Sequence, residues 1–415
     1  TQSRSSAASD VYKRQVLMRF KRGNIEGQIK NIPKEIQWCK RCVISNQRPR
    51  IIFNESGVCS GCVNTDYKNN EVDWDAREKE LVELLDRHRK NNGEWDVIVP
   101  SSGGKDSGFV AHQLRYKYNM NPLTVTWSPL QYTEIGFQNF QACIDSGVSN
   151  LLYTPNGILQ RKLARLCFEE LGDAFHVFVL GQVSYPFHMA LKYNINLVFY
   201  GENGEAEYAG DPLYEDNPFR PAKAWVEQYF KGTSFRELLE YGLTHKDYIS
   251  EEDFSEADLA YYEPPSFENL EKSGIIGEHF YSYYHKWIPQ ENYFYCTEHT
   301  GFKPNPVRSE GTYSKYSSLD DKMDGFHHYL RYIKFGIGRC CDDASHEIRD
   351  GHITREEGVA LMNRYEGEFP AKYFNDFLSY LDITEDFFWQ VVDEWRTPHL
   401  WKKVNKEWQF KFPIK

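Results

Sequence analysis

A glycine-rich turn directly after an apolar run constrains this chain more than any other feature. The run Trp95–Pro100 reads WDVIVP, and Ser102–Ser107 just beyond it reads SGGKDS. A strand that passes through a tight turn into a helix presents several free backbone N–H groups at one point, and such a helix start carries partial positive charge. Two adjacent glycines permit positive φ and let a ligand approach the backbone closely. The pattern therefore predicts a site for phosphate oxygens.

The side chains of this turn suit the same ligand. Lys105 adds a mobile cation, Ser102 and Ser107 add hydroxyl donors, and Asp106 can hold Mg²⁺ beside the phosphates. The spacing is not that of the Walker loop, GxxxxGK[ST]. It resembles instead the SGGxDS loop of the PP-loop ATP pyrophosphatases, which grips the pyrophosphate that leaves when ATP donates AMP. The alternative is a Gly-Gly turn in an ordinary α/β crossover.

Strand and helix patterns alternate after this turn. We expect this part of the chain to be α/β, with a parallel, doubly wound sheet of the PP-loop (adenine nucleotide alpha hydrolase-like) type that binds ligands at its carboxyl edge. The strands are predicted at 95–100, 122–127, 150–153, 175–180 and 195–200, and the helices at 73–90, 105–118, 137–147, 157–171 and 184–193.

Two further features fall at this predicted edge. Trp127 ends its strand there and either stacks on adenine or belongs to the core. Gly201, Glu202 and Asn203 follow the last predicted strand. They either supply a carboxylate for Mg²⁺ and an amide for adenine or substrate, or form an acidic surface turn.

Four cysteines near the N-terminus have the spacing of metal ligands. They form two CxxC pairs, Cys39 with Cys42 and Cys59 with Cys62, separated by sixteen residues. Two such pairs supply four thiolates to a tetrahedral ion, which predicts a zinc ribbon whose Zn²⁺ is structural. Disulfides and an iron–sulfur cluster are the alternatives. The residues Asn54–Gly57 between the pairs are predicted to form the turn of a hairpin.

Composition and charge limit the remaining possibilities. The net charge of −11 disfavours a large nucleic-acid surface, although Lys13–Arg50 is locally basic. No apolar run approaches the roughly 20 residues that span a bilayer, and no signal peptide is visible, so we expect a cytoplasmic protein without membrane contact. We divide the chain into a disordered or non-native leader (1–24), a zinc ribbon (25–70), a PP-loop ATP-binding domain (71–210), a helical insertion (211–305) and a helical substrate-binding part (306–415).

The C-terminal part combines an apolar helix stripe with clustered polar side chains. Phe326, Leu330, Ile333 and Ile337 are spaced as the inward face of a helix. A row of polar side chains lies one position further around the same helix, namely His327, Arg331 and Lys334. This row has two possible roles: it recognises a phosphate or carboxylate group, or it is a solvated helix face. Asp343 and Gly351 are predicted to begin and end a short helix, and Thr354 and Glu357 form a capping box. These capping roles leave four polar side chains of the segment without a predicted structural role, namely Arg339, His346, Arg349 and Arg355.

Together these motifs resemble the N-acetyl sugar amidotransferases of bacterial surface-polysaccharide biosynthesis, a PP-loop family. The resemblance rests on the two CxxC pairs, the loop Ser102–Ser107 and Gly201–Asn203, and its most specific part is the stretch from Tyr332 to Gly351. It covers most of the chain after about Ile36. It implies that ATP adenylates an N-acetyl oxygen of a nucleotide-linked acidic sugar, and that ammonia from a separate glutaminase subunit replaces AMP to give an acetamidino sugar for O-antigen or another surface glycan.

We assign roles on this basis. Lys105 and Asp106 are the expected catalytic residues. The expected nucleotide and Mg²⁺ site comprises Ser102, Gly103, Gly104, Lys105, Asp106, Ser107, Trp127, Gly201, Glu202 and Asn203. The expected substrate ligands are Lys334, Arg339, His346 and Arg349, and the zinc ligands are the four cysteines. Two alternatives remain: a PP-loop enzyme of tRNA thiolation, in which Cys143 or Cys296 carries a persulfide, and a non-catalytic nucleotide-binding scaffold.

Overall fold

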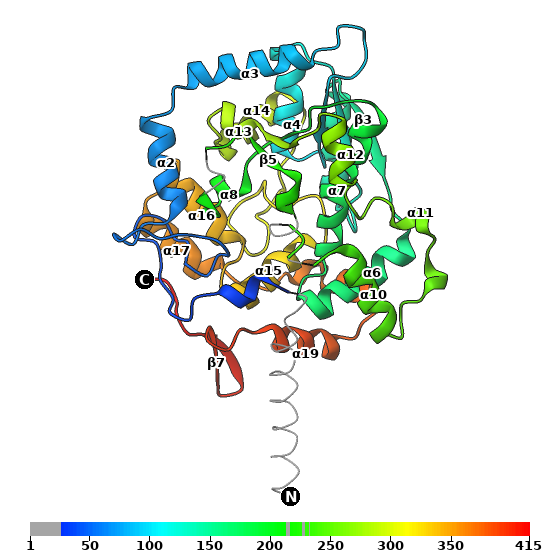
Figure 1. Cartoon of the computed structure of the whole chain (residues 1–415). Helices are drawn as coiled ribbons and strands as arrows, with labels where there is room; N and C mark the ends of the chain where they lie inside the picture. The colour runs from blue at the N-terminus through cyan, green and yellow to red at the C-terminus, as the bar shows by residue number, and fades with distance from the viewer. Residues whose placement is uncertain (1–25, 213–215, 226–228, 232) are drawn as a thin grey trace, which may run out of the picture.

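A central β-sheet with helices on both faces organises the molecule (Figure 1). The computed structural model describes residues 26–212, 216–225, 229–231 and 233–415, so the predicted leader (1–24) lies outside the described residues. Its strands follow the spatial order β3-β2-β1-β4-β6-β5, because an isolated bridge between Ile98 and Val198 joins two three-stranded sheets side by side. All neighbours in this order are parallel except β5 and β6, which are antiparallel.

The first half of the sheet follows the predicted alternation of strands and helices. Strand β1 is rich in β-branched apolar residues, and its buried Val97 and Val99 face one core while Ile98 faces the other. The elements of this half are α3 (Trp74–His88), β1 (Val97–Pro100), α4 (Lys105–His112), the π turn η2 (Gln113–Lys117), β2 (Pro122–Trp127), α5 (Glu134–Asp145), β3 (Ser149–Tyr153), α6 (Gly157–Leu171) and α7 (His176–Lys192).

The predicted strand at 175–180 is wrong, because these residues lie at the start of helix α7. This helix is buried on nearly all sides, so its apolar residues show no period that separates a helix from a buried strand. The predicted strand at 195–200 is reduced to β4 (Phe199–Tyr200) and the bridge at Val198. Helices α3 and α6 and strands β1, β2 and β3 match their predictions to within a few residues.

The stretch 211–305, predicted to be helical, adds two strands to the sheet. Strand β6 pairs with β4 and carries Glu278, which is buried against Arg220 of β5. A strand with a buried charged residue lacks the apolar signature by which strands are recognised in a sequence. Helix α8 (Gly204–Glu207) precedes this stretch, whose elements are β5 (Phe219–Pro221), α10 (Phe235–His245), α11 (Glu256–Leu259), α12 (Phe267–Lys272), β6 (Gly277–Phe280), α13 (Tyr281–Tyr284) and α14 (Pro289–His299).

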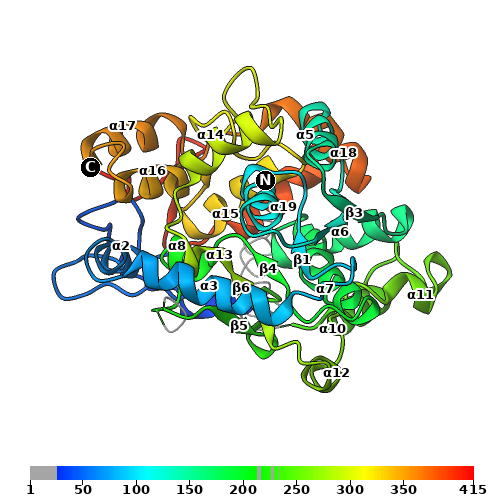
Figure 2. The ribbon, with the colours of Figure 1, turned by 90° about the horizontal axis from the view of Figure 1, so that it is seen from above.

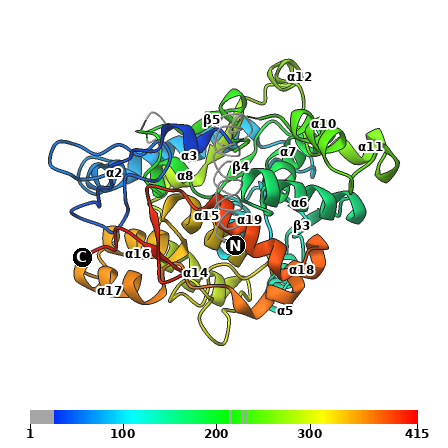
Figure 3. The same ribbon diagram turned by 90° about the horizontal axis from the view of Figure 1, so that it is seen from below.

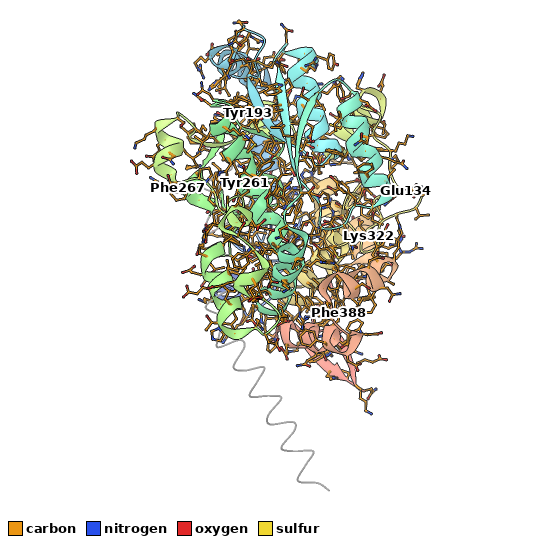
Figure 4. The ribbon with its side chains drawn as sticks, turned by 90° about the vertical axis from the view of Figure 1, so that its right-hand side faces the viewer. Glu134, Tyr193, Tyr261, Phe267, Lys322 and Phe388 are labelled. Atoms are coloured by element: carbon orange, nitrogen blue, oxygen red, sulfur yellow. The ribbon has the colours of Figure 1, made fainter. Side chains whose placement is uncertain are left out.

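The C-terminal part is mainly helical, as expected, and packs beneath the sheet (Figure 3). The predicted stripe on α15 is buried, and the capping box of Thr354 and Glu357 begins α17. The elements are α15 (Asp324–Phe335), α16 (Arg339–Arg349), α17 (Arg355–Tyr365), α18 (Phe374–Leu381), α19 (Glu385–Trp395), β7 (Trp401–Val404) and β8 (Glu407–Phe410). In the side view of Figure 4, Tyr193 after α7 lies in the upper part of the molecule and Phe388 on α19 in the lower part.

One helix boundary in this part differs from the prediction. Asp343 does not begin a helix, because α16 starts at Arg339 with Gly338 as its N-cap. Asp343 lies one turn inside the helix, where its carboxylate accepts a hydrogen bond from Arg339 Nε at 3.1 Å. The helix ends before Gly351, whose positive φ of 79° agrees with the predicted stop.

The cysteine-bearing N-terminal segment packs against the C-terminal helices. Helix α2 (Ser60–Asn70) lies beside α16 and α17 although they are far apart in the chain, α16 beginning only at Arg339 (Figures 1 and 2). Arg355 at the start of α17 donates hydrogen bonds to the carbonyl oxygen of Cys39. The domain boundaries drawn from the sequence stay a prediction, but this contact joins the first described segment to the last.

Candidate functional site

The turn between β1 and α4 is shaped as its sequence predicts. Gly103 has φ +87°, a backbone conformation that favours glycine, and a Cβ there would stand 2.4 Å from the Cα of Phe140. The backbone conformation and the close contact both require glycine at this position. The N–H of Gly103 donates to Ser101 Oγ at 3.2 Å, and that oxygen lies 2.9 Å from Ser107 Oγ. Helix α4 begins at Lys105 after Gly104, so its first N–H groups open onto the turn. This is the geometry of an anion site.

The turn lines a cavity of about 310 Å³, which we call the loop cavity. Its opposite walls come from α5, α7 and the segment 302–339, and they hold four aromatic rings and two carboxylates that were not predicted from the sequence. These residues, together with the turn, leave room for a flat, polar-edged ligand beside the phosphate site. The lining comprises Ser102, Gly103, Gly104, Lys105, Asp106, Gly136, Asn139, Phe175, Phe178, Gln182, Phe302, Tyr316, Ser317, Ser318, Leu319, Asp320, Asp324 and Arg339.

Carboxylates gather around the lysine of the turn. Lys105 is buried, with 7% of its surface exposed, and its ammonium pairs with Asp106. Gly201, at the end of β4, lies close enough that a Cβ there would be 3.8 Å from Asp106 Cβ. Burial and the Asp106 carboxylate raise the pKa of Glu202 to about 7. Two carboxylates that repel each other beside a phosphate site fit Mg²⁺, which would be held by Asp106 and Glu202.

Topology explains why these segments meet. The chain passes from β1 outward to β2 and β3, and then returns to place β4 on the other side of β1. The turn after β1 and the segment after β4 therefore flank the point where the strand order reverses, where open α/β sheets bind their ligands. Both segments thus lie at the edge of the sheet where their sequence predicts them.

Asn203 and Trp127 have structural partners. The Asn203 side-chain oxygen accepts hydrogen bonds from the Glu205 N–H at 3.1 Å and from Arg220 Nη2 at 3.0 Å, so it holds the start of α8 rather than facing the loop cavity. Trp127 is buried beneath Gly181 of α7 and beside Tyr262. Of its two predicted roles, the structure favours the core.

Two of the four predicted substrate ligands, Arg339 and His346, line a second cavity that adjoins the first. This cavity, which we call the α16 cavity, has a volume of about 30 Å³ and shares Lys105, Tyr316, Ser317 and Arg339 with the loop cavity. Its remaining lining is Tyr208, Pro289, Gln290, Ser314, Asp342, Asp343, His346, Glu347, Asp350 and His352. Helix α16 thus brings the predicted Arg339 and His346 next to Lys105.

Lys334 is not brought to either cavity. Its ammonium is buried, donates to Glu26 Oε2 at 3.1 Å and to the Leu171 carbonyl at 2.8 Å, and burial lowers its pKa. The other members of its row are also paired inside the protein, His327 with Asp173 and Arg331 with Asp342. The row therefore ties α15 to the surrounding elements, which is neither of the two roles considered from the sequence.

Replacing Lys334 with methionine is expected to destabilise the protein by about 3 kcal/mol, because it leaves the buried Glu26 carboxylate without its closest cation. The fall should appear in the midpoint of urea unfolding, with the KM for ATP unchanged. Lys79→Met, at an exposed position on α3, is the matched control and should leave both quantities unchanged. A raised KM for ATP with unchanged stability would contradict this assignment.

The four N-terminal cysteines form a compact, buried cluster. Their Sγ atoms lie within 4.8 Å of one another, with 3.9 Å between Cys39 and Cys62 and 3.6 Å between Cys42 and Cys59. Tetrahedral Zn²⁺ with bonds of about 2.3 Å separates its sulfurs by about 3.8 Å, so the donor set fits zinc. The backbone N–H of Cys59 lies 3.3 Å from the Sγ of Cys39, the kind of contact that supports a metal-bound thiolate.

Arg349, the last predicted substrate ligand, lies against this cluster instead. Its guanidinium donates to the Glu207 carbonyl, and its Nη1 would be 2.8 Å from a Cβ at Gly61. Burial acts to lower the pKa of Arg349, but the thiolates of Cys42 and Cys62 and their neighbours raise it above its ordinary value. Arg349 thus compensates the negative charge that four thiolates give a zinc site.

Comparison with known proteins identifies the C-terminal part. Residues 310–414 match the family described as LPS biosynthesis protein WbpG-like, C-terminal domain. This part of the chain is similar to the C-terminal domain of WbpG-like proteins. The match confirms the resemblance to proteins of surface-polysaccharide biosynthesis, and it covers α15, α16 and α17, so Arg339 and His346 lie in the matched part.

Two further proteins are similar to part of this chain. An uncharacterised protein of Methanocaldococcus jannaschii, MJ1599, is 32% identical over 89 residues, which is 21% of this chain and 31% of that protein. The match thus spans less than a third of that relative. The NMN synthetase of Francisella tularensis aligns over 55% of this chain and 87% of its own, at 14% identity and a TM-score of 0.23. Within the described residues, no helix is both long and apolar enough to cross a membrane.

Proposed function

We propose that this protein is an ATP-dependent amidotransferase of surface-polysaccharide biosynthesis. It adenylates the N-acetyl oxygen of a nucleotide-linked acidic sugar and replaces AMP with ammonia, giving an acetamidino sugar. The observation that carries the proposal is the loop cavity, in which the glycine turn and Lys105 meet Arg339. The turn that we predict to bind phosphate and a residue of the part similar to WbpG-like proteins thus line one cavity.

The chemistry requires what the turn offers. An amide carbonyl is a poor electrophile, and attack of its oxygen on the α-phosphorus of ATP turns that oxygen into an AMP leaving group while pyrophosphate departs. The N–H groups at the start of α4 and the Lys105 ammonium stabilise the charge on pyrophosphate. Asp106 and Glu202 would hold Mg²⁺, which when bound neutralises phosphate charge.

The acceptor would lie toward the α16 cavity. Arg339 is the cation placed to pair with a phosphate or carboxylate of the sugar, because it lines both cavities beside Lys105. The helices over the sheet edge exclude water from the adenylated amide. Ammonia is supplied by a separate glutaminase subunit, since the cysteines of this chain show no triad-like local signature.

The burial of Cys143 and Cys296 disfavours tRNA thiolation. That reaction needs a reactive thiol, but burial raises the pKa of Cys143 to about 11 and that of Cys296 to about 12. Thiols with such pKa values carry little thiolate at neutral pH. A non-catalytic scaffold would bind ATP at the same turn and release neither AMP nor pyrophosphate.

The test is to incubate the purified protein with ATP, Mg²⁺, ammonium and a panel of nucleotide-linked N-acetyl uronic and nonulosonic acids. We expect one acceptor to give AMP and pyrophosphate in equal amounts, and a product whose mass reports exchange of oxygen for NH. Conversion of the sugar carboxylate to a primary carboxamide exchanges the same atoms and gives the same mass, so fragmentation of the product must locate the new nitrogen. A new nitrogen on the sugar carboxylate, rather than on the N-acetyl group, would move the reaction there. No AMP with any acceptor would favour the scaffold.

A further inference from the structure

One face of helix α7 lines the loop cavity. Phe175, Phe178 and Gln182 lie in one row along this helix, because they are spaced at i, i+3 and i+7. We call these three residues the α7 row. Most of α7 is buried, but Gln182 in its middle is exposed. Packing of the helix does not use this amide, so the α7 row is available to a ligand in the cavity.

The Gln182 amide has no partner inside the protein. Within the described residues it makes no hydrogen bond. Asn139, the second amide in the cavity wall, differs, because its oxygen accepts from the Lys303 N–H at 2.8 Å and its nitrogen donates to the Lys303 carbonyl at 2.9 Å. Gln182 therefore offers a hydrogen-bond acceptor and a donor side by side to an occupant of the cavity.

Aromatic rings accompany this amide. The ring of Phe175 is partly exposed, and the nearly buried ring of Phe178 supports it, with 4.7 Å between the two ring centroids. Phe302 and Tyr316 line the same cavity from the segment that follows α14. Aromatic rings stack on the flat faces of nucleobases, and a side-chain amide pairs with two neighbouring atoms of a base edge. The α7 row thus holds both elements of a nucleobase site.

The distribution of charge argues against the acidic sugar as the ligand of this row. The cations in the cavity wall, Lys105 and Arg339, also border the α16 cavity, whereas the wall formed by α5 and α7 contains no charged residue. Asp320 and Asp324 line the cavity as well, and burial together with Asp324 raises the pKa of Asp320. Carboxylates repel a phosphate or an acidic sugar, while an uncharged wall suits a neutral base.

We propose that the α7 row binds the adenine ring of ATP. Phe175 stacks on the ring, and the Gln182 amide pairs with the N6 amino group and the ring nitrogen beside it. The inference rests on the proposed function in taking ATP as the nucleotide. The triphosphate then lies on the turn after β1, which lines the same cavity, and its volume of about 310 Å³ is in the range of small-molecule sites. The α7 row takes the role that the sequence suggested for Trp127, which is buried in the core.

Binding of a nucleotide that cannot be cleaved between its α- and β-phosphates tests this assignment without turnover. In isothermal titration calorimetry of the full chain with Mg²⁺, Gln182→Ala should bind α,β-methylene ATP about tenfold more weakly than the wild type, because one paired base edge is lost. Both proteins should bind tripolyphosphate, which has no base, with equal affinity. Gln390→Ala, at an exposed position on α19, is the matched control and should bind both compounds as the wild type does.

Changes to the base and to the stacking ring test the two contacts separately. Purine riboside triphosphate lacks the N6 amino group, so the wild type should bind it about fivefold more weakly than ATP, whereas Gln182→Ala should bind the two nucleotides equally. Phe175→Leu keeps an apolar side chain but removes the flat ring. This variant should bind α,β-methylene ATP more weakly than the wild type and tripolyphosphate equally well.

Three results would overturn the proposal. Gln182→Ala could weaken tripolyphosphate as much as the nucleotide, which would show a structural role, or it could leave both affinities unchanged. A loss of affinity for the nucleotide-linked sugar alone would assign the α7 row to the base of that acceptor instead. Failure of the proposed function reads differently: the wild type would show the base-dependent binding and yet release no pyrophosphate with any acceptor.

Discussion

Lys105→Ala is expected to lower the rate of AMP and pyrophosphate formation by about 10²–10³-fold, the usual loss when one stabilising donor is removed from a developing negative charge. The Lys105 ammonium is buried at the start of α4 and borders both cavities, so no exposed lysine can replace it. AMP released per minute by the purified enzyme, at saturating ATP and ammonium, is the measurement.

Controls separate this effect from unfolding. Lys105→Ala should keep its bound zinc, because the cysteine cluster lies against α16 and α17 rather than against α4. Lys79→Ala on the outer face of α3 should be fully active. Asp106→Ala should fail in the same assay and should also raise the Mg²⁺ concentration needed by any residual activity. Near-normal turnover by either variant of the turn would remove these residues from the reaction.

Cys59→Ser is expected to release the metal and to destabilise the region where the first and last segments of the chain meet. Binding energy at a structural zinc site is folding energy, on the order of 10 kcal/mol in small zinc domains. Here the metal would also hold α16, because Arg349 of that helix lies against the cluster. We therefore expect loss of both zinc and activity, although no cysteine lines the loop cavity or the α16 cavity.

Metal content and limited proteolysis check this expectation. The wild type should carry one zinc per chain and resist cleavage in 35–70, whereas Cys59→Ser should carry none and be cut there and near α16. Cys167→Ala, buried in the main core, is the control that should keep its zinc. Wild-type protein that contains no zinc yet is fully folded and active would contradict the metal assignment. Iron and inorganic sulfide in the purified protein would instead show an iron–sulfur cluster at the four cysteines.

The sequence predicts those parts of the site whose residues are close together in the chain. The turn Ser102–Asp106 carries its own conformational requirement, since Gly103 needs positive φ, and the CxxC pairs carry their own ligand geometry. Local chemistry of this kind needs no knowledge of the fold. The same holds for α6, which Asn156 caps at one end and Gly172 ends at the other.

The parts that sequence missed depend on which way a side chain points after folding. Lys334 and Arg339 are five residues apart and equally basic, yet Lys334 is buried against Glu26 while Arg339 reaches both cavities. Phe175 and Phe178 line the loop cavity only because α7 crosses the sheet there. The sequence predicts a strand over the first part of α7, since a helix buried all round has no polar face to reveal its period.

The central claim is that the turn after β1 binds the triphosphate of ATP, and a structure with a bound nucleotide tests it most directly. Crystals of the full chain should be grown with Mg²⁺ and α,β-methylene ATP, in which the bond that would break is blocked. We predict the β- and γ-phosphates on the N–H groups of Gly103–Asp106 with Lys105 in contact. Triphosphate bound elsewhere while this turn stays empty would contradict the account.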